Sequence, residues 1–229
     1  MNAVKKTACA LAVLATTSTA VMAEGSVNVK VIGTITPTAC KPILAGGGTI
    51  DYGVIPPASL NKDTLNQLNN KQLDFAITCD APAKVSLTAI NGRPKTAAGT
   101  TENDLSGPVP NGISNSNGSS VVGLGLDGNK KIGGYNLAIS DVLADGNKVD
   151  YIYSHDKQKW YAEPSGKSAM FDSRYQVSAW AKPGTLTPIA FTTLAGKLNV
   201  QAYLNKASEL DLTKPVKLDG LTTLELVYL

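Results

Sequence analysis

The feature that most constrains this chain is an alternating apolar strand at its C-terminal end. Residues 221–229 place Leu224, Leu226 and Tyr228 on one face, which is the pattern of a half-buried β-strand. No sequence follows to supply a neighbouring strand, but a second alternating face lies near the start of the chain. It consists of Val27, Val29, Val31, Gly33 and Ile35. We therefore expect a domain that is completed by strand pairing between subunits.

A second interpretation gives the N-terminal stretch a local role. Residues 27–35 could form the first edge strand of their own sandwich, paired within the same chain. The ring of Tyr228 is expected to be buried in either arrangement. The sequence therefore leaves open whether this strand pairs in cis or in trans.

Residues 1–23 have the pattern of a secretory signal peptide. Lys5 and Lys6 precede an apolar run, and Ala23 ends a small-residue cleavage site. The mature chain is expected to begin at Glu24 and to lie outside the cytoplasm. No later segment approaches the roughly 20 apolar residues that a membrane-spanning helix needs, so no membrane anchor is expected.

The mature chain has little net charge and two cysteines. Removing Lys5 and Lys6 from 21 basic residues leaves 19 against 18 acidic ones, which predicts no nucleic-acid partner. Cys40 and Cys79 are expected to form a disulfide, because the leader directs the chain to an oxidising compartment. Closing a loop of roughly 40 residues gives a nominal stabilisation of about 4 kcal/mol.

Alternating apolar runs, separated by turn residues, recur along the mature chain. They lie at 50–54, 73–79, 85–89, 122–126, 135–139, 149–153, 175–181 and 198–202. Many short strands without a long amphipathic helix predict one all-β domain, an antiparallel sandwich or barrel. The stretch 101–119, rich in Gly, Asn, Ser, Asp and Pro, is expected to be a long exposed loop.

Motifs for catalysis and cofactor binding occur without their structural context. Residues 123–128 match a dinucleotide fingerprint, but no helix is expected to follow them. Ser154, His155 and Asp156 have the residue types of a catalytic triad, yet neighbouring strand residues point to opposite faces. The chain has one histidine, which leaves no convincing metal-ligand set. The sequence therefore predicts a protein that is not an enzyme and binds no cofactor or metal.

Four features, in this order and spacing, resemble subunits of chaperone–usher pili. They are the alternating stretch 31–35 before Cys40, the strand pattern at 50–55, the run 73–80 around Cys79, and the penultimate Tyr228. The chain is more similar still to the GltF-like family of periplasmic and fimbrial-related proteins. The residues that carry this similarity lie at 33–40, 46–53, 77–82 and 218–229.

The resemblance implies an immunoglobulin-like antiparallel β-sandwich of the pilin type, which lacks one strand and is completed by a donor strand. Residues 24–39 would be an N-terminal extension that carries the donor strand, and residues 40–229 would be the sandwich. Long inserted loops at about 93–175 depart from the simple pilin pattern. A plain shaft-subunit role is therefore not the expectation.

The function implied is that of a non-enzymatic fimbrial, pilin-like or adhesin-related subunit assembled by donor-strand complementation. It would work in the periplasm or on an extracellular fimbrium, with a periplasmic pilus chaperone, an usher and other pilin-like subunits as partners. The donor residues would be Val27, Val29, Val31, Gly33 and Ile35. The strand beside the acceptor groove would carry Leu224, Leu226 and Tyr228.

Two alternatives remain at this point. The protein could be a self-completed periplasmic binding or accessory protein, whose N-terminal strand fills its own groove. It could also be a tip adhesin that binds a carbohydrate or host receptor through Trp160, Tyr161 and Trp180. For Trp180, packing in the core is the simpler expectation.

Overall fold

The computed structural model describes residues 30–34, 38–163 and 168–229. The chain divides into two units, Met1–Thr36 and Pro37–Leu229. In the first unit, residues 30–34 belong to no helix or strand, and Val31 is 92% exposed. The expected signal peptide, Val27, Val29 and Ile35 lie outside the described residues.

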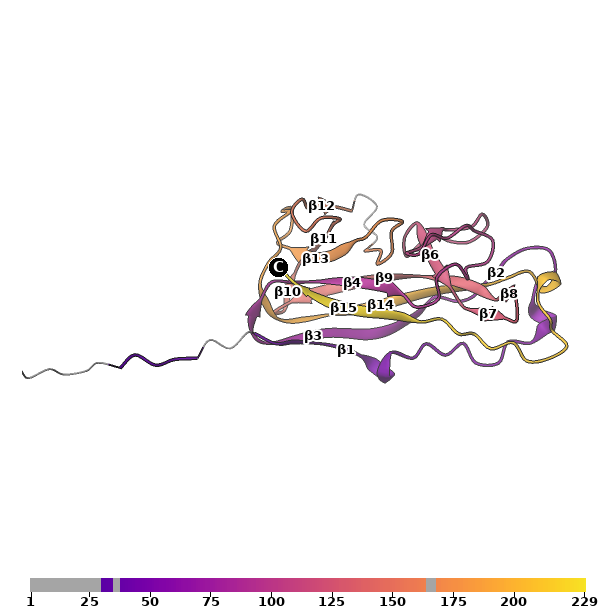
Figure 1. Cartoon of the computed structure of the whole chain (residues 1–229), viewed down its shortest axis with the longest axis horizontal. Helices are drawn as coiled ribbons and strands as arrows, with labels where there is room; N and C mark the ends of the chain where they lie inside the picture. Colours follow the sequence, from indigo (N-terminus) through magenta and orange to yellow (C-terminus); the bar gives the residue numbers. More distant parts are fainter. Residues whose placement is uncertain (1–29, 35–37, 164–167) are drawn as a thin grey trace, which may run out of the picture. The chain divides into compact units, whose positions relative to one another are not determined.

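The second unit is a sandwich of antiparallel strands in two large sheets, most of whose long strands run along one common direction (Figure 1). The larger sheet has the order β1 (Cys40–Leu44), β3 (Lys71–Ala83), β14 (Phe191–Leu204), β9 (Gly133–Ala144), β6 (Ser120–Gly123) and β5 (Gly107–Pro108). Two short strands extend it, β10 (Asn147–Lys148) on β9 and β2 (Asn66–Gln67) on β14.

The second sheet has the order β12 (Tyr161–Ala162), β11 (Asp150–Ser154), β13 (Val177–Ala181), β4 (Val85–Asn91) and β15 (Thr222–Tyr228). A separate small hairpin joins β7 (Leu126–Asp127) to β8 (Lys130–Lys131). Short 3-10 turns occupy Ala45–Gly48, Pro57–Ser59 and Ala207–Glu209, and the described residues contain no α-helix. The predicted all-β sandwich is confirmed.

The main core lies between the two sheets and follows from the period-two pattern of the strands. In β3, Phe75 and Ile77 are buried, whereas Asp74 and Thr78, which point to the other face, are exposed. From the second sheet, Trp180 contributes the largest fully buried side chain and meets Phe191 edge to face, with ring centroids 6.2 Å apart. Core packing of Trp180 is therefore confirmed.

A second, smaller core lies under the long connection between β4 and β6. It consists of Ala97, Ala98, Ile113, Val121 and Tyr203. Because this connection covers part of β9, every residue from Gly133 to Ile139 is buried. The expectation that 101–119 is a wholly exposed loop is thus wrong, since Ile113 and Asn117 are buried within it.

The predicted disulfide is present and joins the first two strands of the domain. Cys40 and Cys79 lie opposite each other in the β1–β3 ladder and are bonded across a sequence separation of 39 residues. The bond fixes β1, which has only β3 as a strand partner in the described part of the chain, at the edge of the larger sheet.

Replacing both cysteines, Cys40→Ala with Cys79→Ala, is expected to lower the free energy of unfolding by about 2 to 4 kcal/mol, because the open chain regains loop entropy. Urea denaturation of the two proteins measures the difference. Wild-type protein under reducing conditions is the control and should unfold like the variant. Equal midpoints for the oxidised wild type and the variant would contradict the prediction.

Candidate functional site

One edge strand of each sheet, β1 and β15, lies along the same side of the sandwich. Within the described residues, β1 pairs with β3 alone and β15 pairs with β4 alone. The two edges meet at one end, where the backbone N–H of Cys40 donates to the phenol oxygen of Tyr228 over 2.7 Å. Farther along, the edges are separated by a groove made of two adjoining cavities, which share Ile50, Tyr52 and Leu218.

The first cavity, the near chamber, lies beside the start of β15 and has a volume of about 420 Å³. Its floor comes from β9 and β14, which place apolar side chains between the two sheets. The apolar lining includes Leu44, Leu124, Tyr135, Leu137, Leu198, Val200 and Leu224. The near chamber is thus a part of the main core that opens at the edge of the sandwich.

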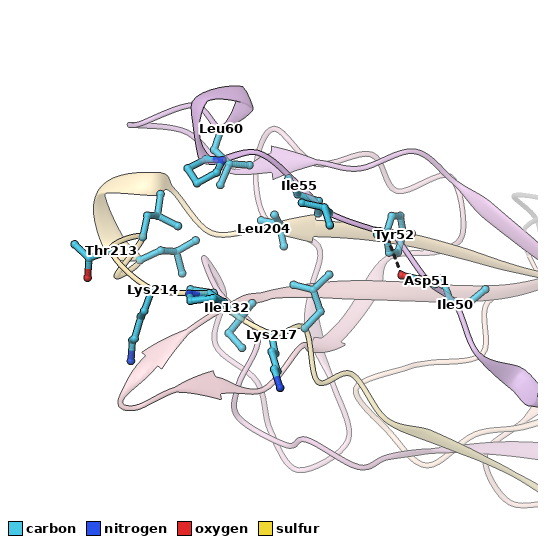
Figure 2. A pocket seen from close by; sticks show the side chains of 18 residues that line it. Ile50, Asp51, Tyr52, Ile55, Leu60, Ile132, Leu204, Thr213, Lys214 and Lys217 are labelled. Atoms are coloured by element: carbon cyan, nitrogen blue, oxygen red, sulfur yellow. Dashed lines mark hydrogen bonds between the residues drawn. The ribbon is translucent and has the colours of Figure 1, made fainter.

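The second cavity, the far chamber, is larger, with a volume of about 730 Å³. It lies before the first residue of β15, and its walls come from residues 50–60 and 210–218. In Figure 2, Ile55, Leu60 and Leu204 converge on it from different segments of the chain. The ammonium ends of Lys214 and Lys217 point away from the cavity. The far chamber therefore has an apolar interior with charged groups at its rim.

The free edge of β15 offers backbone hydrogen-bonding groups to the groove. Gly92 N–H donates to Leu221 O, and Leu229 N–H donates to Lys84 O, so the odd-numbered residues of β15 bond to β4. The even-numbered residues consequently direct their N–H and C=O groups away from β4. They are Thr222, Leu224, Leu226 and Tyr228. No described residue pairs with these backbone groups, which makes β15 a template for another strand.

The opposite wall is an extended segment rather than the strand predicted at 50–54. Residues 49–56 form no ladder with any described residue. Gly53 breaks the regular extended geometry with a φ of 67°, and its N–H donates to the Asp51 carboxylate over 2.7 Å. Beyond this kink Val54 is 97% exposed. The prediction of a paired strand is therefore wrong here, because a turn interrupts the alternation.

Two polar contacts position the chain where it enters β15. The guanidinium group of Arg93 forms two hydrogen bonds to the Asp219 carboxylate, each 2.8 Å long, and holds the pKa of that carboxyl below its usual range. Tyr135 in β9 shares a 2.6 Å hydrogen bond with the Thr222 hydroxyl. Because Tyr135 also lines the near chamber, this bond ties the floor of the groove to its wall.

The residues predicted for the acceptor strand do lie along β15, with one difference. Leu224 and Leu226 are partly buried against the main core, and Leu224 lines the near chamber. Tyr228 is 52% exposed, so the expectation of a buried ring is wrong. Its phenol reaches the β1 backbone at the rim of the sandwich instead of entering the core. Of the predicted donor residues, Val31 and Gly33 are described, and both are exposed.

Most of the groove was not identified from the sequence. The floor residues in β9 and β14 show only the alternation of ordinary core strands. The wall at 210–218 forms no strand. A usable signal was the repeated apolar spacing of Leu210, Leu212, Val216 and Leu218 in a segment without a strand.

The triad-like residues form a turn at the end of β11. Ser154 donates to the Asp156 carboxylate over 3.0 Å, and Asp156 in turn accepts the N–H groups of Gln158 and Lys159. His155 is turned to the carbonyl of Tyr175, with 2.7 Å between Nδ1 and the oxygen. Within the described ranges, no group of three or more His, Cys, Asp or Glu side chains is placed to hold a metal ion.

The aromatic residues considered for ligand binding are engaged in packing. Trp160 packs against Ile152 and its neighbours in a small cluster. Tyr161, 37% exposed, stacks on Tyr153 with centroids 5.6 Å apart and has the Lys159 ammonium group 5.2 Å from its ring centre. These contacts occupy ring surface that a stacked sugar would need. The described residues also include no helix with the length and apolar character needed to cross a bilayer.

Comparison with known proteins identifies distant relatives. Residues 29–136 match a family model described as "Protein of unknown function (DUF1120)". The chain is 28% identical to "Protein GltF" of Escherichia coli (strain K12) in an alignment of 247 positions that covers 97% of each protein. It is 27% identical to "Uncharacterized protein YhcF" of the same organism, over 89% of this chain and 90% of that protein. No solved structure matches the chain significantly.

The chain is thus distantly similar to GltF. The matched family region begins just before the first described residues and ends in β9, so it includes β1, the wall segment 50–60 and part of the groove floor. The similarity to GltF extends over 97% of the chain.

The buried tyrosine at the groove makes the stability depend on pH in the alkaline range. Burial raises the pKa of Tyr135 from 10.0 to about 12. The unfolded chain therefore releases this proton near pH 10, while the folded chain retains it. The stabilisation is complete below pH 10 and is lost as the pH rises toward 12, by about 2 kcal/mol for this residue.

Denaturation with urea at a series of pH values between 8 and 12 measures this dependence. Tyr135→Phe should weaken the alkaline decline and should also cost about 1 kcal/mol at pH 7, because Thr222 loses its partner. Burial also raises the pKa of Tyr151, so Tyr151→Phe serves as a comparison at a site outside the groove. If Tyr135→Phe loses stability at alkaline pH as steeply as the wild type does, then Tyr135 is not the source of the alkaline loss of stability.

Proposed function

We propose that this protein is a non-enzymatic, pilin-like subunit, exported to the periplasm, that assembles by accepting an extended apolar strand along β15. The observation that carries the proposal is the near chamber, where an unpaired strand edge and an apolar floor occur together. Strand addition uses this combination, because main-chain hydrogen bonds supply affinity and pockets select alternate side chains.

The N-terminal extension has the pattern that such a groove requires. Its odd-numbered residues from Val27 to Ile35 are apolar or glycine, and Val31 is exposed in the described part. Burying three valines and one isoleucine contributes on the order of 6 to 12 kcal/mol before the costs of ordering are subtracted. The occupant we propose is the corresponding N-terminal segment of a neighbouring pilin-like subunit, either a second copy of this chain or a related protein. A strand of a periplasmic chaperone would occupy the groove first. At an usher, the N-terminal segment of the next subunit would then replace the chaperone strand.

The direction in which an added strand runs relative to β15 distinguishes this proposal from self-completion. β1 starts at Cys40, beside Tyr228 at the C-terminal end of β15. A strand that precedes Cys40 in the same chain must therefore run toward Tyr228, parallel to β15, with only residues 36–39 as a connection. A strand from another subunit is free of this restriction and can pair antiparallel, which gives the slightly more stable ladder.

Backbone amide exchange, measured by NMR, tests strand addition directly. A synthetic peptide of residues 24–35, added to the mature chain, should slow exchange at Thr222, Leu224, Leu226 and Tyr228, because these N–H groups gain partners. The odd-numbered amides of β15 already bond to β4 and should not change.

Two matched peptides control for non-specific binding. Val31→Asp places a charge on the apolar face and should abolish protection, since an unpaired buried charge is strongly disfavoured. Ile32→Asp places the same charge on the opposite face and should leave protection intact. Protection that is the same with both variant peptides, or absent with the parent peptide, would overturn the proposal.

Removing the extension tests its role in assembly. A chain without residues 24–35 should co-purify with a periplasmic chaperone but should not self-associate, because it can accept a strand and cannot donate one. Size-exclusion chromatography with light scattering measures the mass of the species. Assembly that matches the full-length protein would contradict donation in trans. A truncated chain that does not fold, even in the presence of the chaperone, would favour self-completion.

A further inference from the structure

The far chamber differs from the rest of the groove in how it can hold an occupant. Its walls end before β15 begins at Thr222, so the free backbone edge of β15 does not extend along it. The opposite wall is kinked at Gly53. An occupant of the far chamber is therefore bound through its side chains, whereas an occupant of the near chamber also gains ladder hydrogen bonds.

The far chamber is also too large for the side chains of the chain's own extension. An apolar cavity of about 150 Å³ is sufficient to hold a benzene ring, and the far chamber has about 730 Å³. Residues 24–39 contain no aromatic residue, leucine or methionine, and isoleucine is their largest apolar residue. A valine or isoleucine would contact less of this apolar surface than a larger aromatic side chain would, which forfeits dispersion energy.

The lining favours a large, rigid apolar group. Most of it is formed by branched aliphatic side chains, with two prolines, Pro57 and Pro215, and one aromatic residue, Tyr52. The polar residues that also line it are Asp51, Thr213, Lys214 and Lys217. The phenol of Tyr52 is already used, because it donates to Val200 O over 3.1 Å. Polar selection inside the cavity is thus weak, and an aromatic side chain would bury a large area there at low cost in conformational entropy.

We infer that the far chamber selects a partner strand with an aromatic side chain at the end that extends beyond β15, supplied by a different protein and not by a second copy of this chain. This inference rests on the proposed strand addition at β15. The chain's own extension can enter the groove but fills only its near chamber. A heterologous strand that also fills the far chamber binds more tightly and displaces it.

A phenylalanine scan of the extension tests the inference. Five peptides of residues 24–35, each with a single phenylalanine at position 27, 29, 31, 33 or 35, are titrated by calorimetry against the full mature chain. Phenylalanine at one of the two end positions, 27 or 35, should lower the dissociation constant of the peptide at least about tenfold, as expected for burying a large apolar side chain. Phenylalanine at the three interior positions should give no gain.

Variants of the chamber wall establish where the gain arises. Val216→Trp fills the far chamber from the wall and should remove the gain while the parent peptide binds as before. Leu60→Trp is a second filling variant on the opposite wall, in case the first does not fold. Leu186→Trp, at an exposed leucine that lines neither chamber, is the matched control and should keep the gain.

The outcomes separate the two proposals. If the parent peptide binds and no phenylalanine position improves it, the far-chamber inference is wrong and strand addition stands. A gain at interior positions, or a gain that persists in both filling variants, also overturns the inference. If no peptide of the series binds, the proposed strand addition fails as well.

Discussion

The unpaired edge of β15 is the constraint on which the rest of the structure depends. Four residues of this strand direct backbone N–H and C=O groups away from β4, and two of them, Leu224 and Leu226, pack their side chains against the main core. Backbone groups without partners are disfavoured wherever water is excluded, and apolar side chains are disfavoured wherever it is not. Unpaired backbone groups and apolar side chains occur together at this edge. An extended apolar segment relieves both costs at once, since it brings hydrogen-bonding groups and apolar side chains together.

The edge is held in place by contacts from other parts of the domain. The disulfide fixes β1 to β3, and the Cys40 backbone in turn contacts the Tyr228 phenol at the end of β15. At the start of β15, Arg93 holds Asp219 and Tyr135 holds Thr222. Both ends of the strand are therefore anchored independently of any partner. A pre-organised edge lowers the ordering cost of binding, which lets a short segment form a stable contact.

Under the proposed strand addition, the groove combines two kinds of recognition. The near chamber lies beside a free strand edge, so it can bind any extended segment with apolar residues at alternate positions. This binding depends little on side-chain size. The far chamber has no such edge and depends on the volume and shape of one side chain. A groove of this kind can admit several related strands and still distinguish among them, because the specificity resides at one end. The polar groups near the groove, Arg93 and Asp219 among them, serve to position the wall.

Local pattern was sufficient for the strands and the disulfide. Period-two alternation in β3, β9 and β14 reflects burial on one face of a strand, a property that each segment carries by itself. Cys9 lies in the expected signal peptide, so the two cysteines of the expected mature chain allow one pairing. The free edge of β15 was also inferred from the sequence, because Leu224 and Leu226 alternate in a terminal strand.

Tertiary structure alone decided where the groove has its volume and which residues line it. The floor side chains come from strands distant in the sequence, and their alternation is the same whether they face a filled core or a cavity. The turn at Gly53 interrupts a segment that alternates like a strand, and the exposed Tyr228 shows that an apolar pattern does not specify burial at the last position of an edge. Volume depends on how segments pack against one another, and no local pattern encodes it.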